Sequence, residues 1–157
     1  MSGPKIAIRD ARASDAQTLV EFATAMARET EELDLDRATL SAGVAALLAD
    51  PAKGRVFLLE EDGRMAATLM LTTEWSDWRN GWFWWIQSVY VAPEHRRRGH
   101  YRRLHEHVRA LAAAEPSVYG LRLYVERENR GAQATYRALG MQETAYRLYE
   151  EMTRKAE

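Results

Sequence analysis

Hydrophobic and polar residues alternate in several short segments of the chain, which is the pattern of β-strands that have one buried face. On this pattern we predict strands over residues 5–9, 55–60, 65–73, 82–91, 118–125 and 141–152. The second and third strands are separated by a turn that contains Asp62-Gly63, a pair typical of a tight hairpin. The fourth is rich in aromatic and β-branched side chains, so it is the clearest strand in the chain.

Elsewhere the hydrophobic residues recur every three or four positions, as they do on the buried face of a helix. We predict helices that begin at Ser14 or Asp15, that run through residues 40–48, that span residues 99–114, and that extend from the capping residue Asn129 to Gly140. The resulting order, β-α-α-β-β-β-α-β-α-β, predicts an α/β fold in which a helix joins the fourth strand to the fifth in parallel. No linker or repeat interrupts the chain, so we expect residues 1–157 to form a single domain.

Composition excludes several classes of protein. Hydrophobic residues make up 46% of the 157 residues and charged residues 29%, which is typical of a globular protein rather than a disordered one. The absence of cysteine excludes disulfides, cysteine-based zinc sites and a thiol nucleophile, and we expect no metal site. The longest apolar run has six residues and the N-terminus has no apolar signal segment, so we expect no membrane span and a cytoplasmic location.

The net charge of −1 conceals two oppositely charged parts. Residues 1–94 carry 9 basic and 15 acidic side chains, a net charge of −6, whereas residues 95–157 carry 13 and 8, a net charge of +5. The two parts therefore suit different ligands, or different parts of one ligand. The balanced total disfavours a nucleic-acid partner.

Residues 88–102 have the order strand, basic turn, helix start. Free N–H groups and the dipole at a helix start favour an anion there, and Gly99 lets the backbone approach a ligand closely. Arginine adds positive charge and forked donors that suit phosphate, at Arg96, Arg97, Arg98 and Arg102. The segment is neither a Walker loop nor a Rossmann fingerprint, and taken alone it also fits a solvated basic turn.

Two segments carry a resemblance to a known family. Residues 89–99 read V-Y-V-x-P-E-x-R-x-x-G, which is similar to motif A of the GNAT superfamily, the acyl-CoA-dependent N-acetyltransferases. Residues 125–141 read V-E-x-x-N-x-x-A-x-x-x-Y-x-x-L-G-M, which is similar to motif B of that superfamily. The resemblance covers nearly the whole chain and implies a GNAT-like mixed central sheet with helices on both faces.

The resemblance implies acetyl-CoA as co-substrate. Backbone groups of residues 89–91 would pair with the pantetheine arm, and one of their N–H groups would stabilise the oxyanion of the thioester. The basic turn would hold the pyrophosphate, and Asn129 would contact the cofactor near the pantetheine. The implied cofactor-binding residues are Val89, Tyr90, Val91, Arg96, Arg97, Arg98, Gly99, His100, Tyr101, Arg102 and Asn129. Tyr101 departs from the family, which usually has Gly or Ala there, and we expect its ring to turn onto the buried stripe of the helix.

The resemblance also implies that Tyr136 is the general acid that protonates the departing thiolate. The spacing alone fits simpler roles, with Asn129 as a helix cap and Tyr136 as a core aromatic residue. A Glu that lies inside the fourth strand in several family members has no counterpart here. The candidates for the base that deprotonates the amine are Glu126, Glu74 and a chain of water molecules.

The acceptor side carries aromatic and acidic residues. All five tryptophans lie between residues 75 and 85, and the residues predicted to bind the acceptor are Trp75, Trp78, Trp85 and Glu29. The tryptophans inside the fourth strand, Trp82, Trp84 and Trp85, fit the core or the interface of a homodimer better than an acceptor site. We therefore predict an N-acetyltransferase that moves an acetyl group directly to a primary amine of a small molecule. The alternatives are the same chemistry on a protein N-terminus or lysine, a non-catalytic acyl-CoA sensor, and an RNA-binding module.

Overall fold

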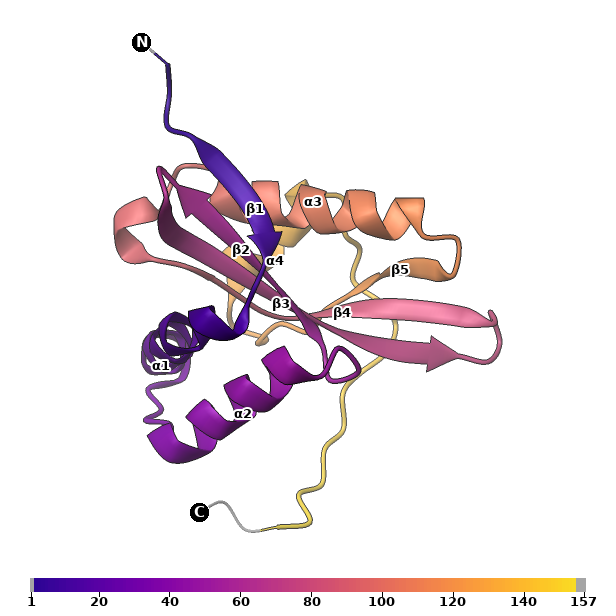
Figure 1. Cartoon of the computed structure of the whole chain (residues 1–157). Coiled ribbons are helices and arrows are strands. Elements are labelled where there is room, and N and C mark those ends of the chain that lie inside the picture. Colours follow the sequence, from indigo (N-terminus) through magenta and orange to yellow (C-terminus); the bar gives the residue numbers. More distant parts are fainter. Residues whose placement is uncertain (1, 155–157) are drawn as a thin grey trace. The chain divides into compact units, whose positions relative to one another are not determined.

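The computed structural model describes residues 2–154, which divide into a unit that ends at Tyr124 and a second unit that begins at Val125. The first unit contains a five-stranded sheet in the order β1-β2-β3-β4-β5 (Figure 1). Its strands and helices are β1 (Ile6–Asp10), α1 (Ala16–Glu31), α2 (Arg37–Ala49), β2 (Arg55–Glu61), β3 (Arg64–Ser76), β4 (Gly81–Val91), α3 (His100–Ala114) and β5 (Val118–Arg122). Strands β1 to β4 pair antiparallel and β5 pairs parallel to β4, which confirms the mixed sheet and the parallel connection.

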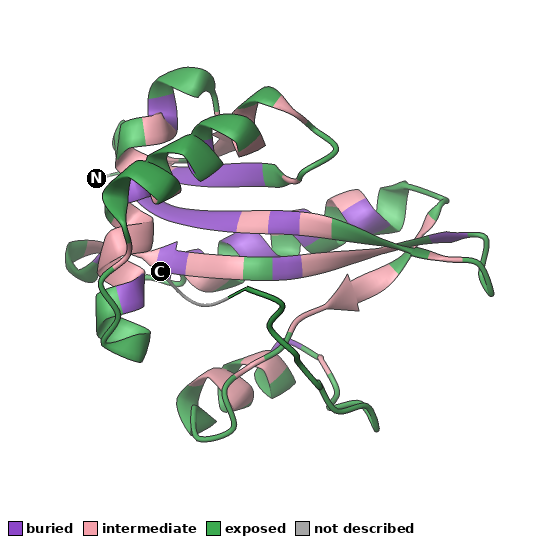
Figure 2. Ribbon diagram, turned by 90° about the horizontal axis from the view of Figure 1, so that it is seen from below, coloured by how far each residue is buried: buried purple, intermediate pink, exposed green. Residues whose placement is uncertain are grey.

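Two hydrophobic cores lie on opposite faces of this sheet, so helices cover both faces as expected (Figure 1). Strand β2 contributes to both cores because successive side chains of a strand point to opposite faces. Phe57 and Leu59 pack with Leu104 of α3, whereas Leu58 packs with Leu19 of α1. Figure 2 shows the central strands buried along much of their length.

Local sequence signals define several boundaries, although not all of them as predicted. The turn between β2 and β3 uses positive φ angles of 50° at Asp62 and 79° at Gly63, the geometry of a tight hairpin. Asp15 precedes α1, but its carboxylate bonds to Arg9 and to the backbone N–H of Arg12 instead of capping the helix. Asp36 caps α2 by accepting a hydrogen bond from the N–H of Thr39.

The second unit contains α4 (Arg130–Ala138), which Asn129 caps by accepting a hydrogen bond from the N–H of Ala132 at 3.1 Å. The helix is followed by Gly140 with φ of 95°, as expected for a helix end. The predicted strand over residues 141–152 is wrong, because no strand forms there. Alternation indicates which residues suit a strand but supplies no partner, and the described part of this unit has no other strand.

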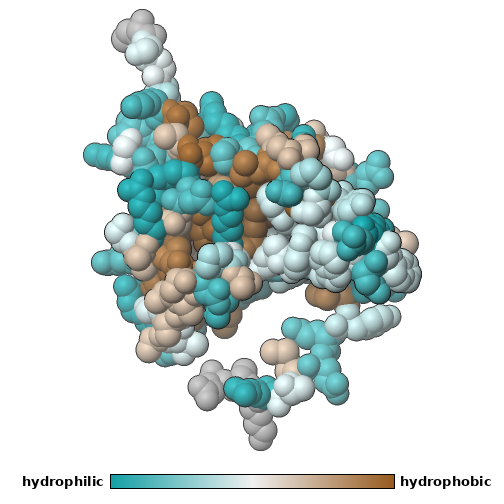
Figure 3. Space-filling model, turned by 45° about the vertical axis from the view of Figure 1, so that its right-hand side comes forward, coloured by the Kyte–Doolittle hydropathy of each residue, from teal (hydrophilic) through white to brown (hydrophobic). Residues whose placement is uncertain are grey.

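Strand β5 is also shorter than the predicted 118–125. Its pairing with β4 ends at Trp85 and Arg122, so residues 123–125 have no ladder to extend. On the face drawn in Figure 3, hydrophilic residues surround an area where hydrophobic residues reach the surface. No helix within residues 2–154 is long and apolar enough to span a membrane.

Candidate functional site

The C-terminal part of β4 has one open edge. Met70 pairs with Ser88 and Leu71 pairs with Ile86, so Gln87 is an extra residue that forms a β-bulge. Strand β5 pairs with β4 only as far as Trp85. In the sheet of the first unit, residues 88–91 therefore have β3 on one side and no strand on the other.

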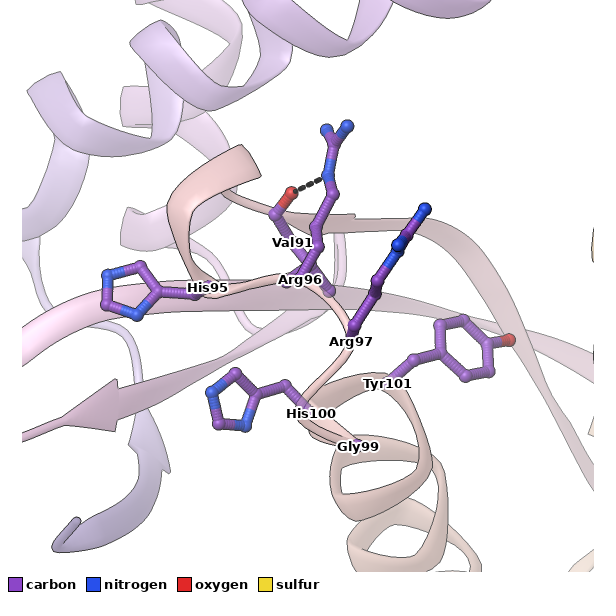
Figure 4. Close-up of a pocket in the computed structure, with 7 residues that line it drawn as sticks. All are labelled: Val91, His95, Arg96, Arg97, Gly99, His100 and Tyr101. Carbon is purple, nitrogen blue, oxygen red and sulfur yellow. Dashed lines mark hydrogen bonds between the residues drawn. The ribbon is translucent and has the colours of Figure 1, made fainter.

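The hydrogen-bond pattern shows which backbone groups point to this open edge. The N–H of Ala92 donates to the carbonyl of Ala66 at 2.8 Å, and such pairs recur at every second residue of an antiparallel ladder. Tyr90 therefore directs its backbone groups to β3, whereas Val89 and Val91 direct theirs to the open edge. The Val91 carbonyl accepts a hydrogen bond from Arg96 Nε at 2.9 Å (Figure 4).

The side chains at this end of β4 alternate between the two faces of the sheet. Val89 and Val91 pack on the α3 side. The Tyr90 ring packs against Phe22, and its hydroxyl donates to Glu29 Oε1 at 3.3 Å. Burial, followed by the nearby Glu29 carboxylate, raises the pKa of Tyr90, so the hydroxyl remains protonated at neutral pH.

Residues 96–101, which we call the anion cradle, run from the end of the short 3₁₀ helix Pro93–His95 into the first turn of α3. Arg97 and Gly99 adopt positive φ angles of 64° and 79°, and Gly99 is an N-cap that has no side chain to cover the first N–H groups of α3. All cradle residues except Arg98, together with Val91 and His95, border a hollow of about 220 Å³ (Figure 4). Exposed N–H groups in this conformation form an anion-binding concavity.

The four arginines predicted to bind phosphate differ in their contacts. Arg96 pairs with Glu29 Oε2 at 2.7 Å, Arg98 with Glu61 at 2.8 Å, and Arg102 weakly with Glu106 at 3.5 Å. Arg97 has no ion-pair partner within residues 2–154 and borders the hollow, so its charge is available to a ligand.

The Tyr101 ring lies in the first turn of α3, where it borders the hollow and stacks with His105 at 6.3 Å between ring centroids. His105 is fully buried, so the ring does turn toward the buried stripe of the helix. Its position at the edge of the hollow means that Tyr101 also shapes the space that a ligand would enter (Figure 4).

Glu61 is a site residue that the sequence analysis did not identify. Its Oε2 accepts hydrogen bonds from His95 Nδ1 at 2.5 Å and His100 Nε2 at 3.1 Å, and its Oε1 accepts one from Arg98. These bonds, those from His95 and His100 first, lower the pKa of Glu61 to about 2. Glu61, His95 and His100 each place a potential metal ligand atom within 4.8 Å of the others. The sequence does contain one signal for this site. Glu61 is a charged residue two positions after Leu59, so it lies on the face of the strand that Phe57 and Leu59 make apolar.

The predicted acceptor residues are divided between two places. Glu29 lies at the Val91 end of β4, whereas Trp75 pairs with Trp82 near the opposite end, with the two rings edge to face at 4.8 Å. The paired positions Thr68–Tyr90 and Trp75–Trp82 are separated by seven residues of β3, or about 23 Å of strand. The structure therefore does not bring Glu29 together with Trp75.

The remaining acceptor candidates have different environments. The Trp78 side chain is 88% exposed in the turn between β3 and β4. Trp85 Nε1 donates to Glu74 at 3.0 Å, and Arg122 pairs with the same carboxylate at 2.8 Å. The hydrogen bond from Trp85, and then the bond and charge of Arg122, lower the pKa of Glu74, which makes it a weaker base.

The residues of the second motif lie in the second unit. Glu126 accepts a hydrogen bond from the N–H of Glu128 at 2.6 Å, Asn129 caps α4, and Tyr136 lies within that helix. The capping role proposed for Asn129 is thus confirmed. A cap uses the side-chain oxygen and leaves the amide NH₂ group available as a donor.

Comparison with known proteins identifies a family. The family model described as Acetyltransferase (GNAT) family matches residues 15–141. A possible acetyltransferase from Clostridium difficile 630 is 43% identical, with a TM-score of 0.92, and the match covers 96% of this chain and 99% of that one. No curated protein sequence matches this chain significantly.

More distant structures share the fold. An aminoglycoside N-acetyltransferase AAC(6')-Iy in complex with CoA is 14% identical, with a TM-score of 0.78 and 98% of each chain covered. A ribosomal-protein-alanine N-acetyltransferase from Brucella melitensis biovar Abortus 2308 is 18% identical, with a TM-score of 0.74, and the match covers 94% of this chain and 99% of that one.

Proposed function

The chain belongs to the acetyltransferase (GNAT) family, and on this premise we propose that it moves an acetyl group from acetyl-CoA directly to a primary amine of a small molecule. One observation carries the proposal: the open edge of β4 leads, through the short 3₁₀ helix Pro93–His95, into the anion cradle. An extended arm that ends in a diphosphate suits this arrangement, because amide groups along the edge pair with the arm and N–H groups at the helix start face the diphosphate.

The chain's residues fit acetyl-CoA at two points. Val89 and Val91 offer backbone groups at the open edge, where an N–H also stabilises the oxyanion that forms on the thioester carbonyl. Arg97 and the first N–H groups of α3 face the pyrophosphate, while Arg96 and Arg98 hold the turn through Glu29 and Glu61. When bound, the cofactor supplies an activated acetyl group.

In the proposed reaction, the neutral amine attacks the thioester carbon, a C–N bond forms, and the C–S bond breaks. The amine loses a proton to a base, and the departing thiolate takes a proton from the Tyr136 hydroxyl. The lowered pKa of Glu74 disfavours it as that base, so Glu126 is the carboxylate that we assign to the role. In this assignment, a water molecule between the amine and Glu126 would pass the proton to the carboxylate.

The acceptor proposal draws on charge and aromatic side chains. Residues 1–94 carry a net charge of −6, which attracts a cationic amine, and exposed Trp75 and Trp78 offer faces for cation–π contacts. Trp85, within β4, belongs to the same proposal, whereas Glu29 does not, because it lies at the opposite end of β4 from Trp75 and is paired with Arg96. The aminoglycoside and ribosomal-protein enzymes differ in acceptor, so the fold itself does not choose between a small amine and a protein amine.

The experiment is a thiol-release assay with acetyl-CoA and a panel of small amines, peptides with free N-termini and lysine peptides. We expect turnover with small cationic amines and one product acetylated on nitrogen, identified by mass spectrometry. Turnover with peptides only would reassign the acceptor. Failure of the protein to bind acetyl-CoA in calorimetry would refute the proposed function.

A further inference from the structure

Glu61 places a negative charge on the sheet face that packs against α3. It is the last residue of β2, and strand alternation puts it on the same side as Phe57 and Leu59. Its side chain is only 5% exposed. A buried carboxylate needs donors around it, so its partners indicate what it does.

All three partners of Glu61 come from one short segment, residues 95–100, which follows it by 34 to 39 positions along the chain. His95 lies before the two residues with positive φ, Arg98 lies between them, and His100 lies after them. Arg103 adds a further brace, because its guanidinium donates to the Arg98 carbonyl at 2.5 Å. Glu61 thus contacts the residue just before the cradle and two residues within it, Arg98 and His100.

We propose that Glu61 is a positioning residue that holds the anion cradle in its binding conformation. The inference rests on the proposed function, because the anion is then the pyrophosphate of acetyl-CoA. Glu61 acts through His95, Arg98 and His100 and does not itself touch the cofactor. An unpaired carboxylate behind a phosphate site would repel the ligand, so the ion pair between Glu61 and Arg98 also reduces this repulsion.

Under this proposal, Arg97 and Arg98 of the cradle have different roles. Arg98 is committed to Glu61, whereas Arg97 borders the hollow without an ion-pair partner within residues 2–154. The carboxylate stays ionised at neutral pH, since its hydrogen bonds with His95 and His100 lower the pKa of Glu61 to about 2. The brace therefore persists over the whole neutral pH range.

The contacts favour a hydrogen-bonded anchor over a metal site. Arg103 Nη1 donates to His100 Nδ1 at 3.2 Å, so Nε2 carries the proton and donates to Glu61. His95 Nδ1 and Glu61 Oε2 are in direct contact through a short hydrogen bond of 2.5 Å, and the Arg98 cation occupies the other carboxylate oxygen. A metal ion would have to displace both the protons and Arg98.

The test compares Glu61→Gln with Glu60→Gln, a matched change on the same strand. Glu60 pairs with Arg9 on the opposite side of the sheet, away from the cradle. We expect Glu61→Gln to raise the Kd for CoA by about tenfold, because charged hydrogen bonds to the cradle are lost. Glu60→Gln should leave the Kd unchanged, and kcat at saturating acetyl-CoA should stay within about twofold in both variants.

A second donor separates positioning from general damage. S-acetylpantetheine lacks the pyrophosphate, so Glu61→Gln should lower kcat/KM for acetyl-CoA and leave kcat/KM for S-acetylpantetheine unchanged. Equal losses with both donors, or equal CoA affinity in the two variants, would overturn the proposal. Failure of the wild-type protein to bind CoA would instead refute the proposed function.

Two further measurements keep the proposal testable. If Glu61→Gln does not fold, His95→Ala should weaken CoA binding and His95→Asn should restore it, because the Asn amide can replace the Nδ1 donor. Equal binding by both His95 variants would contradict the brace. A zinc titration tests the metal alternative. If Zn²⁺ binds tightly, if Glu61→Gln abolishes that binding, and if the metal-free variant binds CoA with unchanged affinity, the cluster is a metal site and not a brace.

Discussion

The two units of the chain hold their functional residues in different ways. In the first unit, contacts between residues distant in sequence fix the cradle, as Glu61 binds His95 and Glu29 binds Arg96. In the second unit, the bonds of Asn129 and Glu126 reach backbone groups only two or three residues away. In the proposed reaction, the first unit binds the cofactor through the cradle and the second unit supplies Tyr136 and Glu126. We therefore expect substitutions in the first unit to change the Kd and substitutions in the second unit to change kcat.

The largest expected effect tests the second unit. Tyr136→Phe removes the hydroxyl that we assign as general acid, and kcat should fall by about 100-fold, within the range for lost acid catalysis. The Kd for acetyl-CoA should not change, as calorimetry would show. Full activity of this variant across the pH range would remove Tyr136 from its role and would break the division between the units.

The next effect tests the backbone of the first unit. Gly99→Ala places a side chain at φ of 79°, which costs about 1–2 kcal/mol, and relief of this strain turns the N–H groups of the cradle away. The Kd for CoA should rise by about tenfold. Gly63→Ala is the matched control, because Gly63 has the same φ in the β2–β3 hairpin and lies outside the cradle. It should lower the melting temperature and leave the Kd unchanged.

A smaller effect distinguishes two adjacent arginines. Arg97→Ala should weaken CoA binding severalfold at low salt and less at high salt, since exposed charges are screened. It should leave the melting temperature unchanged. Arg98→Ala should lower the melting temperature, because Glu61 then keeps a buried charge with one partner fewer. Identical profiles for the two variants would contradict the assignment of Arg98 to the scaffold.

The smallest effect concerns the stability of the first unit. His105 is fully buried in α3, its ring nitrogens have no hydrogen-bond partner within residues 2–154, and burial lowers the pKa of His105 below its ordinary value of 6.5. Below pH 6.5 the unfolded chain takes up a proton that the folded chain does not, so the free energy of unfolding should fall as the pH drops. His105→Leu should reduce this slope in denaturant titrations at pH 5 to 7. A slope equal to that of the wild-type protein would exclude His105 as its source.

Local signals in the sequence predicted most of the fold. Asp62-Gly63 marked the hairpin, Asn129 marked a helix cap, and the aromatic pattern marked β4. The strand predicted over residues 141–152 was wrong because an alternating pattern does not reveal whether a partner strand is present. Single residues suffice for a turn or a cap, whereas a strand depends on a second segment.

The same limit applies to the candidate site. The position of the cradle between a strand and a helix could be predicted, because its residues are contiguous from Arg96 to Tyr101. The role of Glu61 could not, since its partners lie 34 or more positions away. The bulge at Gln87, in the pairing of β3 with β4, also has no local signature. Distant contacts therefore determine which cradle arginine lacks an ion-pair partner among the described residues, and which backbone groups of β4 have no neighbouring strand.

The most direct test of the central claim is an amide NMR titration with CoA. If the open edge of β4 and the cradle hold the cofactor, the amide signals of Val89, Val91 and residues 99–102 should shift, and their hydrogen exchange should slow. The amide of Tyr90, which faces β3, should be protected before and after addition. Binding of CoA with no change at Val89, Val91 and the cradle would contradict the claim.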